Sequence, residues 1–428
     1  MSSNKDDDGN NVEDKNKNNG DDFERIDGEL RFAGRVATWT VRPSLLGFRF
    51  IRFLTNLAKG QELKCADNDY ESLTAWIDRK GKGKSGGGIG SGGEDKMRVR
   101  IFRPRKGSRQ GGGGGGEDGS QQQKEDRQPH RQRLPLVLYY HGGGYAFGVP
   151  EMNLPFIKAL VETRACVVVA PDYRLSLDEP YPAAFDDCYA ALIWAKGQAL
   201  ADEEEEEVAA ASGNSASGGN ASGEDEDSGD KGVFGGLARS DQIFVVGHSA
   251  GGGLAAAVAI KGRDTGDVNV AFQMPVYPML DDRQTNPTAA GNSMPVWNSH
   301  HNKLAWDLYL RGLRGEGEIK KNEDDEHERD AVVPVYAAPA RLEDYTGLPP
   351  AATFVGDLDP FLDETRAYVE KLEKAGVPAK FRVFEGCYHG FDDVVPNASK
   401  SREAIRFAAE AYADAADTCF AAQRKRQK

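Results

Sequence analysis

The 428-residue sequence predicts a doubly wound α/β domain, in which a mostly parallel sheet lies between two layers of helices. Short, continuous apolar runs at 134–140 and 165–170 are typical of buried parallel strands. Segments with helical spacing of apolar residues separate such runs, as in βαβ units. Several runs end in glycine-rich or acidic turns, and the carboxyl ends of strands are where an open sheet of this class gathers its site.

The N-terminal part of the chain precedes the main domain. Residues 1–22 are polar and acidic, and we expect them to form a disordered tail. In region 23–80 the apolar spacing is partly helical, which predicts two or three helices. The alternating residues 97–102 predict a strand at the start of the main domain, which we place at 95–418.

Low-complexity inserts interrupt the main domain. The glycine-rich stretch at about 106–133 and the acidic, Ser/Gly-rich stretch at about 201–236 offer little apolar surface to bury, so we expect disordered loops there. An irregular segment at about 280–345 contains Trp297 and Trp306, and it suits a lid over a site. The remaining pattern predicts helices at 156–163, 183–200, 363–375 and 400–416, and strands at 243–246, 268–275, 351–355 and 379–384.

Composition excludes several classes of function. The formal net charge of −14 comes largely from acidic runs, and a net acidic chain does not suggest nucleic-acid binding. The five cysteines show no C-x-x-C spacing, so neither a disulfide framework nor a zinc site is expected. The N-terminus lacks the apolar region of a signal peptide, and no stretch approaches the roughly 18 apolar residues of a membrane span. We therefore expect a cytoplasmic protein.

The motif that carries chemistry is Gly247-His248-Ser249-Ala250-Gly251. It joins the apolar run 243–246 to a Gly-then-Ala stretch, 252–260, that has no helix breaker after Gly253. A G-x-S-x-G sequence between a strand and a helix is typical of a strained turn that exposes the serine hydroxyl. The small residues on either side of the serine let the strand and the helix approach closely. Taken alone, the motif fits a glycine-rich turn equally well.

A serine nucleophile needs an imidazole base, and elimination among the seven histidines leaves His389. His389 lies between glycines directly after the predicted strand 379–384, at the sheet edge where Ser249 is expected. The other six lie in low-complexity loops, in glycine motifs or in the lid segment: His130, His141, His248, His300, His301 and His327.

The third member of such a triad is an acid, expected between the serine and the histidine in the chain. Asp357, Asp359 and Asp363 all follow the predicted strand 351–355. Asp363 also suits the N-terminus of the next helix, where an acidic group complements the helix dipole. Position alone does not separate the three; Asp359 is the first choice, and Asp357 is its competitor.

Backbone donors for an oxyanion are expected from two places. The residue after the serine, Ala250, is one. The second is the loop His141-Gly142-Gly143-Gly144, which follows the strand 134–140 and leaves amides free to point at a ligand. Phosphate binding is the rival use of such a loop, but no G-x-x-x-x-G-K motif occurs there.

Together these motifs resemble the hormone-sensitive-lipase-like carboxylesterases of the α/β-hydrolase fold, over roughly residues 97–416 without the inserts. The resemblance implies that Asp359 is the triad acid and that the amides of Gly143, Gly144 and Ala250 form the oxyanion hole. We also expect Tyr145 and His248, which belong to these motifs, to bind the substrate. The matching stretches are His141-Gly142-Gly143-Gly144-Tyr145, Asp172-Tyr173-Arg174-Leu175, Tyr181-Pro182-Ala183-Ala184, Gly247-His248-Ser249-Ala250-Gly251-Gly252, Asp359-Pro360-Phe361-Leu362-Asp363 and His389-Gly390-Phe391.

Two departures from the family pattern are present. Ser176-Leu177-Asp178 stands where members often have Ala-Pro-Glu, so the acidic residue is kept but has a shorter side chain. His248 replaces the frequent Asp before the serine, a variation that the family tolerates. Neither departure removes a member of the triad.

The resemblance implies an eight-stranded sheet, with a helical cap formed by the N-terminal region and the segment after Tyr277. It also implies hydrolysis of short- to medium-chain acyl esters of small molecules through an acyl-enzyme, with no metal or cofactor. A homodimer is compatible with this expectation. A deacetylase, amidase or lactone hydrolase would share the same residues, whereas a non-catalytic ligand-binding protein would be expected to lack His389.

Overall fold

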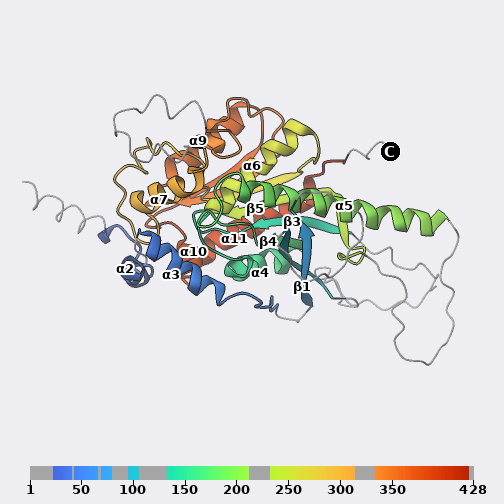
Figure 1. Ribbon diagram of the computed structural model, residues 1–428, viewed down its shortest axis with the longest axis horizontal. Helices are drawn as coiled ribbons and strands as arrows, with labels where there is room; N and C mark the ends of the chain where they lie inside the picture. The colour runs from blue at the N-terminus through green and yellow to red at the C-terminus, as the bar shows by residue number, and fades with distance from the viewer. Residues whose placement is uncertain are drawn as a thin grey trace, which may run out of the picture.

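The computed structural model describes residues 23–40, 43–65, 69–79, 95–105, 133–211, 232–313 and 333–423. The predicted tail at 1–22 lies outside the described residues, as do most of the two predicted inserts at 106–133 and 201–236. In Figure 1 the described part has a central sheet with helices on both sides. This is the predicted α/β architecture.

The sheet has eight strands in the order β1-β2-β4-β3-β5-β6-β7-β8. The two pairings at one edge, β1 with β2 and β2 with β4, are antiparallel, and all the others are parallel. The strands are β1 (Tyr70–Asp78), β2 (Lys96–Pro104), β3 (Leu134–Tyr140), β4 (Val167–Pro171), β5 (Ala238–His248), β6 (Phe272–Val276), β7 (Ala351–Gly356) and β8 (Ala379–Phe384).

Helices cover both faces of the sheet. The α-helices are α2 (Arg31–Thr40), α3 (Leu45–Asn56), α4 (Leu154–Thr163), α5 (Ala183–Ala211), α6 (Ala250–Thr265), α7 (Ser299–Leu310), α9 (Leu362–Lys374), α10 (Phe391–Val394) and α11 (Ser399–Thr418). Short 3₁₀ helices are η1 (Pro150–Asn153) and η3 (Pro339–Arg341).

Alternate residues of the central strands divide between two hydrophobic cores, because successive side chains point to opposite faces of a sheet. In β3, Leu136 and Leu138 pack in the core that contains buried residues of α5 and α6. Val137 and Tyr139 pack on the other face, in the core shared with α4 and α11. The strand is therefore buried on both faces, and this explains its continuous apolar run.

Two differences from the sequence prediction are the largest. Region 23–80 was expected to be helical, but its last part forms the edge strand β1, which pairs with β2 from Tyr70↔Pro104 to Asp78↔Lys96. The helical expectation for this part is wrong, because pairing with a distant strand decided its conformation.

The second difference lies in α5, which was expected to end near Leu200 but continues to Ala211. The acidic run was read as an insert, yet Glu and Ala are strong helix formers. Tertiary contacts also hold this part of the helix. Asp202 accepts a hydrogen bond from the Gly236 amide at 3.0 Å, and Glu203 accepts one from the Ser240 hydroxyl at 2.7 Å.

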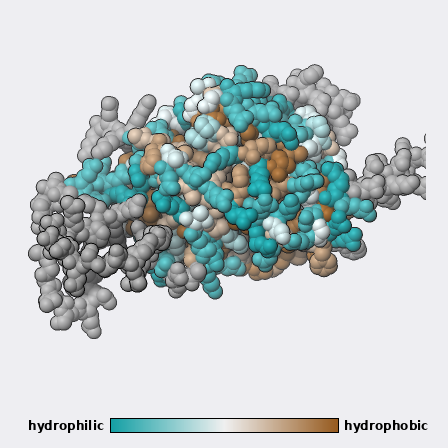
Figure 2. All heavy atoms as spheres, turned by 180° about the vertical axis from the view of Figure 1, so that it is seen from behind, coloured by the Kyte–Doolittle hydropathy of each residue, from teal (hydrophilic) through white to brown (hydrophobic). Residues whose placement is uncertain are grey.

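The predicted lid segment contains α7, whose Trp306 and Tyr309 are buried in the α5/α6 core. Residues 314–332 of that segment lie outside the described part. The face seen in Figure 2 is largely hydrophilic, and hydrophobic residues emerge on it as separate patches. Among the described helices, none is long and apolar enough to cross a membrane.

Candidate active site

Ser249 lies at the turn between β5 and α6, with φ 56° and ψ −119°. A residue other than glycine rarely adopts this conformation, so the turn is strained. The flanking glycines are sterically required: a Cβ on Gly247 would lie 2.3 Å from the Gly251 carbonyl oxygen, and one on Gly251 would lie 2.1 Å from the Tyr140 carbonyl oxygen. The predicted close approach of strand and helix is therefore present.

Three side chains that follow different strands meet at this turn. The Ser249 Oγ lies 2.8 Å from Nε2 of His389, and Nδ1 of His389 lies 2.8 Å from Oδ2 of Asp359. His389 follows β8 and Asp359 follows β7, so all three positions lie at the carboxyl edge of the sheet. The exposed fractions of Ser249, His389 and Asp359 are 5%, 4% and 0%. The three groups thus form one buried hydrogen-bonded chain.

Asp357 and Asp359 have different partners in the structure. Oδ1 of Asp357 accepts a hydrogen bond from the Gly386 amide at 2.7 Å, which ties the turn after β7 to the one after β8. Oδ1 of Asp359 accepts one from the Phe361 amide at 2.8 Å, and its second oxygen faces His389. Only Asp359 is therefore hydrogen-bonded to the imidazole.

The glycine loop after β3 lies against the serine turn. A Cβ built on Gly142 would lie 3.5 Å from the Ser249 Cβ. Gly143 and Gly144 have φ values of 115° and 56°, in the region that favours glycine. Within the described part of the chain, the amides of Gly143, Gly144 and Ala250 donate no hydrogen bond to another backbone group. The loop thus offers backbone donors beside the serine.

His141 and Tyr173 brace this loop from behind. The two rings stack with centroids 4.1 Å apart, and the Tyr173 hydroxyl donates to the His141 carbonyl at 2.7 Å. Nδ1 of His141 lies 2.8 Å from the Gly142 carbonyl oxygen, which fits a donated N–H. Burial lowers the pKa of His141 to about 4. The imidazole is therefore neutral at neutral pH, and one donated bond from Nδ1 is compatible with this state.

The two residues expected to bind substrate have other contacts. Tyr145 stacks on Tyr309 of α7 with centroids 3.9 Å apart, and its hydroxyl donates to the Met279 carbonyl at 3.1 Å. Nδ1 of His248 lies 2.7 Å from the Tyr139 hydroxyl. Both side chains are thus held within the protein interior. Their contact with a substrate stays a prediction.

Aromatic side chains form a wall over the glycine loop and the histidine. Trp297 of the predicted lid segment lies against Gly144, because a Cβ there would be 2.3 Å from its ring. Its ring centroid lies 6.2 Å from that of His389 and 5.9 Å from that of Phe48, which stacks on it from α3. The N-terminal helices and the lid segment therefore meet above the site, as the expected cap would.

Sequence reasoning did not single out Tyr277 or Asp392. The Tyr277 ring meets the His389 ring edge to face at 4.8 Å, and the Tyr277 hydroxyl donates to Oδ1 of Asp392 at 2.9 Å. Tyr277 follows β6 directly, and Asp392 lies three residues after His389. Their positions close to the ends of strands could have marked them as site residues in the sequence. These contacts fix the histidine ring from the side.

Comparison with known proteins identifies the family of the fold. The family model described as alpha/beta hydrolase fold matches residues 137–393. Carboxylesterase NlhH of Mycobacterium tuberculosis is 30% identical over 277 residues, which are 63% of this chain and 72% of that protein. An arylesterase of Saccharolobus solfataricus is 29% identical over 259 residues, which cover 60% and 68%.

Solved structures give the same result. A bacterial heroin esterase has a TM-score of 0.63 at 26% identity and covers 92% of this chain and 99% of its own. Esterase LipW from Mycobacterium marinum has the same TM-score at 24% identity, covers 92% and 96%, and supports the fold. The extent of the family match and the 30% identity show that this chain belongs to the α/β-hydrolase family, in the group that resembles the hormone-sensitive-lipase-like carboxylesterases.

Proposed function

We propose that this protein is a serine hydrolase of short- to medium-chain carboxylic esters, with Ser249 as nucleophile, His389 as general base and Asp359 as the group that orients the histidine. Nε2 of His389 takes the Ser249 proton as Oγ bonds to the acyl carbon. The protonated imidazole then gives this proton to the leaving alkoxide as the ester bond breaks, which leaves an acyl-enzyme. Water, deprotonated by the same imidazole, releases the acid and restores the serine.

The observation that carries the proposal is the hydrogen-bonded chain from Ser249 through His389 to Asp359. An ionised carboxylate only accepts hydrogen bonds, so Asp359 favours the tautomer with the proton on Nδ1 of His389. Nε2 is then free to accept the proton of Ser249, which is the polarity that nucleophilic attack needs.

Charge on the tetrahedral intermediate would be stabilised by the amides of Gly143, Gly144 and Ala250. The glycine φ values and the lack of backbone acceptors for these amides among the described residues support this role. These donors also suffice without a metal ion, because backbone dipoles can neutralise an oxyanion in a buried site.

The substrate class rests on the relatives and on the wall of the site. The similar proteins are named as esterases, including a carboxylesterase and an arylesterase. Trp297 and Phe48 give the region near the serine an aromatic surface, which suits an apolar acyl or aryl group. We therefore propose small esters with apolar acyl or alcohol parts as substrates.

We also propose a cytoplasmic location. All five cysteines are free thiols, which fits a reducing compartment. Fractionation of cells that express a tagged full-length chain tests this, and recovery in a secreted fraction would contradict it.

The test compares hydrolysis of p-nitrophenyl acetate and butyrate by the wild type and by Ser249→Ala. We expect activity only in the wild type, with both proteins equally folded by circular dichroism. A variant as active as the wild type would refute the assignment of Ser249. Amide and lactone probes with the same acyl groups extend the test, and higher kcat/KM on either class would replace the ester proposal with that activity.

A further inference from the structure

Helix α3 carries an apolar stripe on the side that faces away from the protein. Leu46, Phe50, Phe53 and Leu57 have exposed fractions of 78%, 53%, 60% and 68%. Their spacing of four, three and four residues places them on one face of the helix and its final turn. Such a contiguous set of large exposed apolar side chains marks an interaction surface. We call these four residues the α3 stripe.

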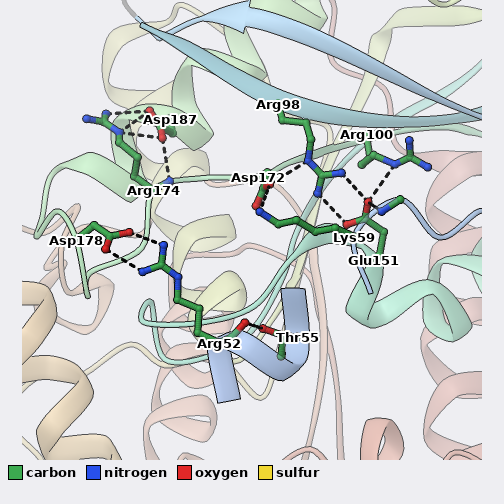
Figure 3. A network of polar contacts seen from close by, with 11 residues as sticks. Arg52, Thr55, Lys59, Arg98, Arg100, Glu151, Asp172, Arg174, Asp178 and Asp187 are labelled. Atoms are coloured by element: carbon green, nitrogen blue, oxygen red, sulfur yellow. Dashed lines mark hydrogen bonds and ion pairs between the residues drawn. The ribbon is translucent and has the colours of Figure 1, made fainter. Parts of the chain in front are cut away.

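The opposite side of α3 is fixed to the core. Phe48 is buried and stacks on Trp297, and Ile51 packs in the same core. Figure 3 shows two ion pairs that hold the helix and the turn after it: Arg52 pairs with Asp178 at 2.6 Å, and Lys59 pairs with Asp172 at 3.1 Å. These anchors orient α3, so the stripe points outward in the folded protein.

The segment that carries the stripe has no acidic residue of its own. Residues 31–60 contain six Arg and Lys and no Asp or Glu, in a chain whose formal net charge is −14. Arg49 is exposed at the flank of the stripe. Two residues beyond Leu57, Lys59 lines a surface hollow of about 470 Å³ together with Arg79, Lys96 and Arg98. Asp172, which pairs with Lys59 and Arg98, also lines it.

An apolar helix face flanked by basic residues is the pattern of a helix that lies in the interface of an anionic membrane. A second copy of the chain fits less well, because a two-fold contact through the stripe would bring Arg49 of both copies together and residues 31–60 supply no acidic partner. We propose that the α3 stripe docks on an anionic lipid surface, with its side chains in the interfacial layer and Arg49 at the headgroups. This goes beyond ester hydrolysis, since docking needs no turnover.

The docking has a consequence for the site. The stripe and the residue that stacks on Trp297 belong to the same helix, so a docked protein would hold its catalytic wall within one helix diameter, about 10 Å, of the lipid. Esters that partition into the membrane would then reach the site over a short path.

The test is co-sedimentation of the full-length wild type with sucrose-loaded vesicles. We expect binding to phosphatidylcholine vesicles with about one third phosphatidylserine, and about tenfold weaker binding to phosphatidylcholine alone. Phe50→Ser/Phe53→Ser should lower the partition coefficient about tenfold or more. Arg49→Glu should lower it about fivefold.

Two sets of variants control for folding and for general stickiness. Leu46→Ser/Leu57→Ser removes the other half of the stripe and should have the same effect. Val208→Ser and Phe420→Ser remove exposed apolar side chains elsewhere, 68% and 52% exposed, and should leave binding unchanged. Circular dichroism and p-nitrophenyl ester hydrolysis in solution report separately on the fold and on the proposed function.

Three results would overturn the proposal. One is the absence of vesicle binding by a wild type that is folded. Another is binding that neither double variant weakens. The third is a wild-type dimer in sedimentation velocity that both double variants convert to monomer, since the stripe would then belong to a contact between copies.

Discussion

Replacing Asp359 by Asn should disable the site through the tautomer of His389. Oδ1 of Asp359 accepts the Phe361 amide, and Oδ2 faces Nδ1 of His389 at 2.8 Å. In Asp359→Asn the amide oxygen would keep the Phe361 donor, which leaves the NH₂ group facing the imidazole. Nδ1 must then accept, so the ring proton moves to Nε2, which can no longer take the proton of Ser249.

The corresponding exchange in serine-protease triads lowers kcat by about 10⁴-fold. That factor equals about 5.5 kcal/mol of barrier, at about 1.36 kcal/mol for each tenfold. We expect a loss of this order in kcat for p-nitrophenyl butyrate, with little change in melting temperature because the side chain keeps its size and its bond to Phe361.

Asp357→Asn is the matched control. Asn keeps an oxygen for the Gly386 amide, so both activity and stability should stay close to those of the wild type. The reasoning is refuted if Asp359→Asn keeps kcat within about tenfold of the wild type, well short of the loss seen in known triads. It is also refuted if Asp357→Asn loses as much activity as Asp359→Asn.

Three further predictions follow from the surroundings of the site. Gly144→Ala should lower kcat about 100-fold, because its Cβ would lie 2.3 Å from the Trp297 ring and displace an oxyanion donor; steady-state kinetics would contradict this if kcat is unchanged. Burial lowers the pKa of His141 from 6.5 to about 4, so below pH 6.5 the unfolded state takes up a proton that the folded state does not. The free energy of unfolding should therefore be unaffected by His141 above pH 6.5 and should fall by about 3 kcal/mol as the pH is lowered to about 4. Urea unfolding at pH 7 and pH 5 should show about 2 kcal/mol of this loss in the wild type and a smaller one in His141→Gln, and equal losses would exclude His141 as the cause. Glu151→Gln should destabilise the fold by about 3 kcal/mol, because Glu151 is buried and accepts from Arg98 at 2.7 Å; a melting temperature equal to that of the wild type would show that the pair contributes nothing.

The sequence alone predicted the parallel core of the sheet and the turn that carries Ser249. Both depend on short-range patterns: strands buried on both faces read as continuous apolar runs, and a close strand-to-helix turn requires small residues at fixed positions. Short-range sequence patterns also predicted the glycine loop 141–144 and the position of His389 after a strand. The fold prediction was confirmed by the eight-stranded sheet and the family match.

Long-range contacts decided what local patterns could not. Asp357 and Asp359 are two residues apart and equally placed by position, and the resemblance chose between them. The tertiary structure supplies the physical difference, because one carboxylate bonds to the Gly386 amide and the other to His389. Similarly, β1 is a strand because it pairs with β2. The apolar stripe of α3 points outward because contacts with the core and the Arg52–Asp178 pair fix the other face of the helix. Such outcomes depend on partners far away in the chain, which periodicity and spacing do not record.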